Sequence, residues 1–101
     1  MSLFNEHYMH ASAKFKEVAK EQVEAYRKYQ ESLEKGPFDK KTRELISLSA
    51  SCAILCEYCI DSHSQKAKAS GATEEEIAFV ILLAAAIKHG ATVSYGINAL
   101  K

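Results

Sequence analysis

The sequence predicts an all-α fold, and three observations support this prediction. The 101 residues include one proline and four glycines, so few positions interrupt a helix. Apolar residues recur at spacings of three to five along Glu6–Leu33, with Lys and Glu between them. Helix-capping residues follow at Asp39 and at Thr73, where T-x-x-E forms a capping box. A chain of this length is expected to form one domain, residues 1–101, built as a helical bundle.

The first helical segment covers Glu6–Leu33 and forms one helix or two, because Ser12 is a weak internal start signal. The Gly36-Pro37 pair ends it, since glycine follows many helices and proline cannot continue one. This divides the domain into an N-terminal helical segment, residues 1–35, and a core that carries the motif described below, residues 36–101.

The next helix begins at Lys40, after the N-cap Asp39, and its pattern continues to Ser70 before Gly71. Thirty residues without interruption are long for a helix in a small globular domain. We therefore expect a break near Cys56, although neither proline nor glycine marks it.

The last predicted helices follow the capping box. Glu74–Lys88 is apolar on every side from Ile77 onward, and such a helix has to be buried all round. A chain of 101 residues offers little other surface to cover it, which indicates a homo-oligomer. His89-Gly90 is expected to end this helix, and a short helix follows from about Thr92 to Leu100.

Charge and hydropathy exclude several classes of partner. The formal net charge is zero, which removes the simplest case for nucleic-acid binding. The N-terminus lacks a basic region followed by an apolar run, so no signal peptide is predicted. The apolar run Ile77–Ile87 is shorter than the ~20 residues of a membrane span, so no membrane partner is expected. We expect a cytoplasmic protein, in which a C-x-x-C pair is catalytic or metal-binding rather than a structural disulfide.

Three interpretations compete for the cysteines. On a continuous helix, Cys52, Cys56, Cys59 and His63 fall at i, i+4, i+7 and i+11 and form a single stripe. A zinc site needs ligands ~2.0–2.3 Å from one ion, whereas eleven helical residues rise about 16 Å, so a fourth ligand from elsewhere would be required. Cysteine also packs as a small apolar residue, and this structural reading is preferred for Cys52.

The third interpretation is a redox dithiol formed by Cys56 and Cys59. Helical residues three apart have Cβ atoms roughly 5–6 Å apart, and a disulfide needs about 3.5–4.5 Å, so a small adjustment at a helix start closes the bond. Free amides at a helix start stabilise a thiolate. His63, four residues after Cys59, lies over the same face and could take the thiol proton.

The same residues carry a resemblance to a known family. Glu44, Cys56, Cys59 and His63 match the E-x11-C-x-x-C-x-x-x-H signature of the alkylhydroperoxidase-D-like (AhpD-like) branch of the carboxymuconolactone decarboxylase family. The flanks KKTRELISLSAS and CEYCIDSHSQKAKASGATEEEI also resemble that branch, so that the likeness covers about residues 36–100. It implies an all-α fold with the cysteine pair at a helix start beside a subunit interface, in a dimer, trimer or hexamer.

The resemblance also implies a role for each residue. Cys59 resembles the peroxidatic cysteine that attacks a hydroperoxide, and Cys56 the resolving cysteine that closes the disulfide. His63 resembles the base for Cys59, and Glu44 the carboxylate that orients His63 or relays its proton. An external dithiol donor, lipoyl-bearing or thioredoxin-like, then reduces the pair. No metal, haem or flavin cofactor is implied.

Two positions depart from the pattern, and two other functions stay open. Some peroxidase members have histidine where Tyr58 stands, and a phenol cannot replace imidazole as a base at neutral pH. Many members have proline where Glu57 stands, and its negative charge opposes thiolate formation. The alternatives are a lyase that decarboxylates a carboxylated lactone, which needs no dithiol, and a non-enzymatic oligomer that responds to redox state.

Overall fold

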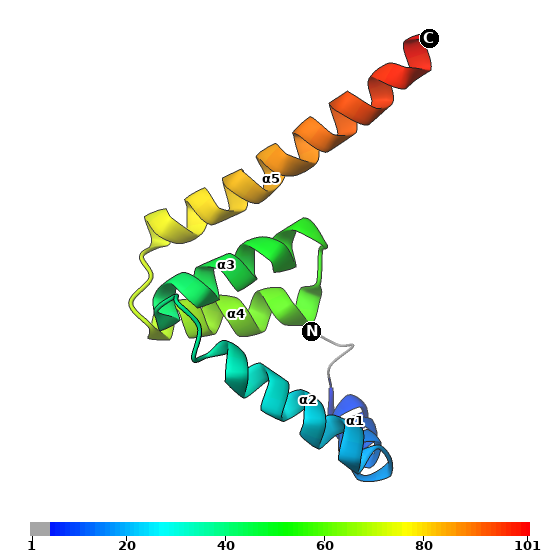
Figure 1. The fold of residues 1–101 in the computed structure, drawn as a ribbon, viewed down its shortest axis with the longest axis vertical. Helices are drawn as coiled ribbons and strands as arrows, with labels where there is room; N and C mark the ends of the chain where they lie inside the picture. Colours follow the sequence, from blue (N-terminus) through cyan, green and yellow to red (C-terminus); the bar gives the residue numbers. More distant parts are fainter. Residues whose placement is uncertain (1–4) are drawn as a thin grey trace. The chain divides into compact units, whose positions relative to one another are not determined.

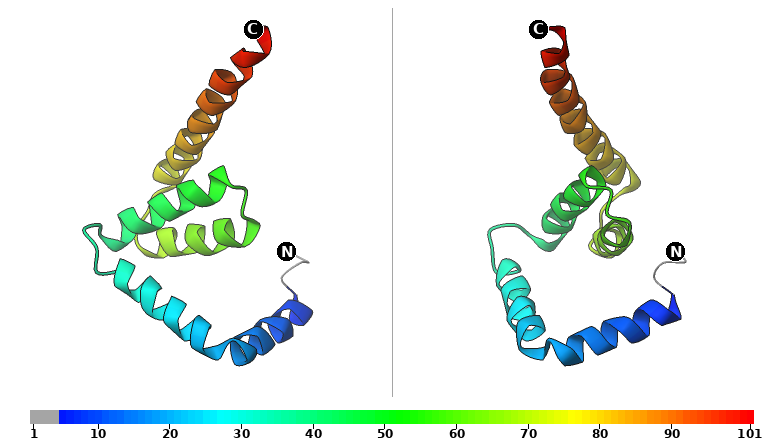
Figure 2. Two further views of the ribbon diagram at one scale, coloured as in Figure 1. Left: turned by 45° about the vertical axis from the view of Figure 1, so that its right-hand side comes forward. Right: turned by 90° about the vertical axis from the view of Figure 1, so that its right-hand side faces the viewer.

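The computed structural model describes residues 5–101, and within this range it contains helices and no strand (Figures 1 and 2). The predicted all-α fold is confirmed. The chain forms two compact units, one that ends at Pro37 and one from Phe38 to Lys101. The elements are α1 (Glu6–Val18), α2 (Lys20–Leu33), α3 (Lys40–Ala53), α4 (Glu57–Ala69), α5 (Glu74–Gly96) and the terminal 3₁₀ helix η2 (Ile97–Leu100).

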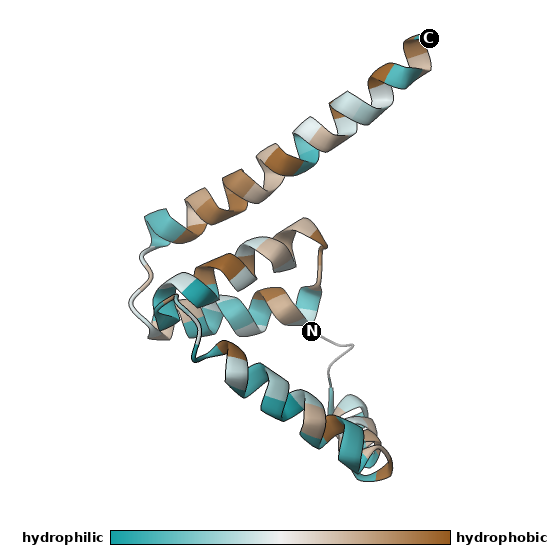
Figure 3. Ribbon diagram, viewed as in Figure 1, coloured by the Kyte–Doolittle hydropathy of each residue, from teal (hydrophilic) through white to brown (hydrophobic). Residues whose placement is uncertain are grey.

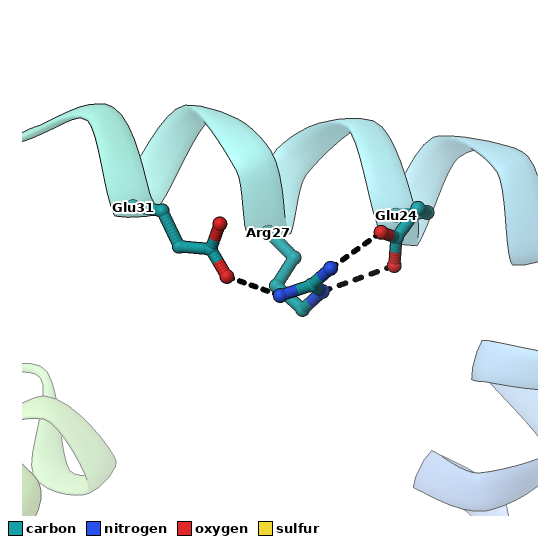
Figure 4. Close-up of polar contacts among 3 residues, drawn as sticks. All are labelled: Glu24, Arg27 and Glu31. Carbon is teal, nitrogen blue, oxygen red and sulfur yellow. Dashed lines mark hydrogen bonds and ion pairs between the residues drawn. The ribbon is translucent and has the colours of Figure 1, made fainter.

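The first unit consists of α1 and α2, so the N-terminal segment forms two helices. The break between them lies at Ala19, which leaves the helical region at φ −107° and ψ 40°, and not at Ser12, which lies inside α1. Neither helix has a buried residue. Arg27 pairs with Glu24 and with Glu31 on the exposed surface of α2 (Figure 4), at the i,i+3 and i,i+4 spacings at which helical side chains are neighbours.

In the second unit, α3 begins where Asp39 predicts and α4 ends just before Gly71, as expected. The Asp39 carboxylate accepts a hydrogen bond from the amide of Thr42 at 2.8 Å, and this bond holds the pKa of Asp39 below its ordinary value. The helix ends at Ala53, and α4 starts at Glu57 with Cys56 as its N-cap. The expected break near Cys56 is therefore confirmed.

The helix α5 is longer than predicted. Both halves of the capping box form, since the Glu76 amide donates to the Thr73 hydroxyl at 3.0 Å and the Thr73 amide donates to the Glu76 carboxylate at 2.9 Å. The expected end at His89-Gly90 is wrong, because α5 continues to Gly96 and passes directly into η2. A glycine inside a helix costs about 1 kcal/mol relative to alanine, which weakens the helix without ending it.

α3 is the centre of the second unit, because it packs against both α4 and α5 (Figures 1 and 2). α3 and α5 run parallel. Two side-chain links join them, and in each link the residue of α5 follows the residue of α3 by 35 positions. Near the helix starts, Lys41 Nζ lies 2.9 Å from a carboxylate oxygen of Glu76. Near the end of α3, Lys88 Nζ donates to the carbonyl oxygen of Ala53 at 3.0 Å, across 35 positions.

Most of α5 is exposed in the single chain. Ala84 is its one buried residue, although hydrophobic residues surround much of the helix (Figure 3). The burial all round that its sequence demands is thus not provided within the second unit. Because the helix does not stop at Gly90, the stretch Glu74–Leu100 is also long and apolar enough to cross a membrane, judged by length and composition alone.

Candidate functional site: the α3–α4 turn

The turn between α3 and α4 is a Schellman motif. The Leu55 amide donates to the carbonyl of Cys52 at 3.1 Å, and the Cys56 amide donates to that of Ser51 at 3.0 Å. The motif requires a residue in the left-handed region after the helix cap, and Leu55 fills this position with φ 57°. Glycine is usual there, because a side chain in this region costs roughly 1–2 kcal/mol.

The end of α4 shows the same motif with the usual residue. Gly71 has φ 92°, and the amides of Gly71 and Ala72 donate to the carbonyls of Lys68 and Ala67. The two turns thus share their hydrogen bonds and differ in the residue that adopts the left-handed conformation. Leu55 is also 75% exposed, so little burial compensates for its conformation. The strained residue lies directly before the cysteine pair.

Cys56 belongs to both helices, since it closes the turn after α3 and is the N-cap of α4. Its sulfur accepts a hydrogen bond from the Cys59 amide at 3.2 Å. The two cysteines are joined by a disulfide, with Cα atoms 5.2 Å apart. Both are half-buried. The backbone of Cys56 is extended and not helical, and this departure from helix geometry at the start of α4 lets the two sulfur atoms approach to bonding distance.

Glu44 and His63 meet between α3 and α4. His63 Nδ1 lies 2.7 Å from Oε2 of Glu44. An ionised carboxylate can only accept, so Nδ1 carries the proton, and Nε2 of a neutral His63 is left as an acceptor. Glu44 is 7% exposed and shares the buried face of α3 with Leu48 and Ser51. Glu44 is therefore not a solvated side chain in the first turns of α3.

The structure thus joins the four predicted residues in two pairs, Cys56 with Cys59 and Glu44 with His63. On α4, Cys59 and His63 are one turn apart and share a face. Within residues 5–101, no three His, Cys, Asp or Glu side chains form a group that could hold a metal ion.

Cys52 stays outside the disulfide as a half-buried free thiol. It lines an apolar groove of about 430 Å³ where the end of α3 meets α4 and α5, together with Ala53, Leu55, Ile60, Ile81, Ala84, Ala85 and Lys88.

Two residues of the site were missed in the sequence. A leucine between two helices carries no turn signal, so the left-handed Leu55 was not foreseen. Lys88 appears in the sequence as an ordinary lysine near a helix end, and its link to Ala53 depends on the parallel packing of α3 and α5. A prediction of parallel packing between these two helices would also have placed Lys88 near the turn.

Comparison with known proteins identifies the family. The sequence matches the carboxymuconolactone decarboxylase family over residues 18–101. The chain belongs to this family. It is 35% identical over 65 residues to a Paracoccus denitrificans protein described as "Uncharacterized protein 4 in cox locus", and 34% identical over 68 residues to an uncharacterized protein of Haemophilus influenzae. These matches cover 64% and 63% of this chain, and 59% and 60% of the relatives, so the chain spans about three fifths of their length.

A crystal structure of a protein from Methanobacterium thermoautotrophicum, determined by the Northeast Structural Genomics Consortium, has the same fold. Its TM-score is 0.80 at 26% sequence identity, and the match covers 89% of this chain and 99% of that chain. The family assignment thus agrees with a shared helical architecture over most of both chains.

Proposed function

We propose that this protein is an AhpD-like thiol peroxidase that reduces hydroperoxides through a Cys56–Cys59 dithiol/disulfide cycle. The observation that carries the proposal is the cysteine pair at disulfide distance at the start of α4, with the linked His63 and Glu44 beside it. Membership of the carboxymuconolactone decarboxylase family, which includes AhpD-like proteins, is compatible with this activity.

In the first step, the Cys59 thiolate attacks the terminal oxygen of the hydroperoxide. The O–O bond breaks, Cys59 becomes a sulfenic acid, and the alcohol leaves with a proton. His63 Nε2 takes the proton from the Cys59 thiol and returns it to the leaving alkoxide, while the Glu44 carboxylate on Nδ1 stabilises the imidazolium between these transfers. The free amides at the start of α4 favour the thiolate.

In the second step, the Cys56 sulfur displaces hydroxide from the sulfenic acid, and a disulfide and water form. An external dithiol then supplies two electrons and two protons to restore both thiols. A thioredoxin-like or lipoyl-bearing protein is the proposed donor, and no metal or organic cofactor takes part. A cytoplasmic location suits this cycle, because thiols are kept reduced there.

A homo-oligomer is part of the proposal. α5 presents an apolar surface that the second unit leaves uncovered, and a second copy of the chain would bury it.

The family name favours a second candidate, a lyase that decarboxylates a carboxylated lactone. That reaction uses no disulfide, so it is expected to survive replacement of both Cys56 and Cys59. Peroxidase activity through the proposed dithiol cycle is expected to be lost in the same variant.

The test is to treat the reduced protein with stoichiometric tert-butyl hydroperoxide, quench it with an alkylating reagent, and map the cysteines by non-reducing peptide mass spectrometry. A rapid Cys56–Cys59 disulfide, reversed by a dithiol, is expected. The matched variants are Cys59→Ser, which should be inactive, and Cys52→Ser, which should resemble the wild type. Unreacted thiols, or slow oxidation that includes Cys52 equally, would reject the peroxidase.

A further inference from the structure

The turn before the dithiol has a link to α5 that the proposed chemistry does not use. Lys88 Nζ donates a hydrogen bond to the Ala53 carbonyl at 3.0 Å. We infer that Lys88 is a positioning residue for the cysteine pair: it completes the end of α3 and thereby holds Cys56 within reach of Cys59. This inference rests on the proposed dithiol function.

The carbonyl groups at the end of α3 show what Lys88 contributes to the turn. The last four carbonyls of a helix have no partner within the helix and need one elsewhere. The amides of residues 54–56 satisfy three of them, those of residues 50–52. The fourth belongs to Ala53, the last residue of α3, and it accepts from the Lys88 ammonium. Lys88 thus supplies from another helix the partner that the turn itself does not provide.

The turn that Lys88 contacts is strained. Leu55 holds the left-handed conformation that glycine takes in the matching turn after α4. A conformation of this kind persists only where the surrounding structure fixes it. The side-chain link from Lys88 enters the turn two residues before Leu55 and three before Cys56. It is therefore well placed to prevent the turn from relaxing.

The link from Lys88 matters most when the two cysteines are reduced. In the oxidised protein the disulfide itself holds Cys56 against Cys59. In the dithiol form this covalent bond is absent, and the turn together with the N-cap contact of α4 keeps the two sulfur atoms close. A rigid turn raises the effective concentration of one thiol at the other, because less conformational entropy is lost on closure. Lys88 is expected to raise this effective concentration.

The effective concentration can be measured by equilibrium with glutathione. The two cysteine thiols lose two electrons and two protons, and one glutathione disulfide gains them to become two glutathione thiols. In full-length Lys88→Met, the equilibrium constant for closure should fall about fivefold, which is ~20 mV for a two-electron couple. Lys88→Arg should stay within about twofold of the wild type, because a guanidinium can also donate to the carbonyl.

Lys41→Met is the matched control. It removes the other link between α3 and α5, the ion pair with Glu76, at the end of α3 away from the dithiol. This variant should leave the equilibrium unchanged. An equal shift in Lys41→Met would overturn the inference, since it would mean that Lys88 only docks α5, and so would a Lys88→Met value within twofold of the wild type.

A second measurement reports on the stability of a hydrogen bond within the turn. Hydrogen exchange of the Cys56 amide, which bonds to the Ser51 carbonyl, should be about fivefold faster in reduced Lys88→Met than in the reduced wild type. Unchanged exchange would count against the inference. Neither experiment contains a hydroperoxide, so a protein without peroxidase activity could still show both effects, and an active peroxidase could lack them.

Discussion

Replacement of Glu44 by glutamine tests the proton-transfer step of the proposed mechanism. Glutamine has the same length, and its amide oxygen can still accept from His63 Nδ1, so the change removes charge and little else. The carboxylate lies 2.7 Å from that nitrogen and is shielded from water, at 7% exposure. The imidazolium that forms during the reaction therefore loses its counter-ion in Glu44→Gln, while the neutral imidazole keeps its hydrogen bond.

The magnitude follows from the difference between the two kinds of hydrogen bond. A bond to a charged group contributes about 1.5–3 kcal/mol, and a neutral one about 0.5–1.5 kcal/mol. The loss of ~1–1.5 kcal/mol in the transition state corresponds to a rate roughly 5- to 13-fold lower. The assay is rapid mixing of the reduced protein with tert-butyl hydroperoxide at pH 7, followed by alkylation of the remaining thiols and mass spectrometry.

Glu57→Gln is the control for this experiment. Glu57 is an exposed carboxylate next to Cys56, and the structure shows no bond between it and His63 among the described residues. Its removal should leave the rate equal or slightly higher, because its charge opposes the thiolate. A Glu44→Gln rate within twofold of the wild type would refute the proposed role of Glu44. An equal slowing in Glu57→Gln would show that general electrostatics, not the link to His63, controls the rate.

Three further predictions concern stability and assembly. Leu55→Gly should raise the free energy of unfolding by ~0.5–1 kcal/mol, a few degrees in Tm, because the relief of the left-handed conformation is partly offset by the conformational freedom that glycine loses on folding. Leu55→Ala should not raise it, because alanine keeps the strained Cβ. The hydrogen bond from the Thr73 amide, and after it the contact with Lys41, lowers the pKa of Glu76 in the folded protein. The ionised Glu76 carboxylate therefore stabilises the fold at neutral pH, and this stabilisation is lost as the pH falls through the lowered pKa. Urea midpoints at pH 7 and about pH 3 should therefore differ less in Glu76→Gln than in the wild type, and equal differences would contradict this. Leu82 is 58% exposed on α5, and Leu82→Glu should place a charge on the proposed oligomer interface. Light scattering should then give a smaller molecular mass for this variant than for the wild type, and a monomeric wild type would contradict the proposed oligomer.

Local signals predicted the helix starts well. Asp39 and Thr73 cap helices where expected, because an N-cap depends on a side chain and an amide three residues away. The break at Cys56 was also foreseen, but only from the length of the helical pattern. Its form was not, since a Schellman turn with leucine in the glycine position has no sequence signature.

Signals that depend on packing were less informative. Gly90 in the sequence predicts a helix end, yet a glycine destabilises a helix only slightly and α5 continues through it. Ser12 was the candidate break in the first segment, whereas the chain bends at Ala19, which carries no cap side chain. The Glu44–His63 link joins residues on two helices and was expected from the family resemblance, while the Lys88 link needed the relative direction of α3 and α5.

The turn at Cys56 has a consequence for insertions and deletions. Glu44 and Cys56 are separated by a helical stretch whose buried face is fixed and by a turn with a fixed number of residues. One residue added within α3 would rotate Glu44 by about 100° relative to the dithiol and carry it off the buried face toward solvent. One residue added in the turn would remove the bond from the Cys56 amide to Ser51. The number of positions between Glu44 and Cys56, which is eleven, therefore belongs to the site as much as the four side chains do.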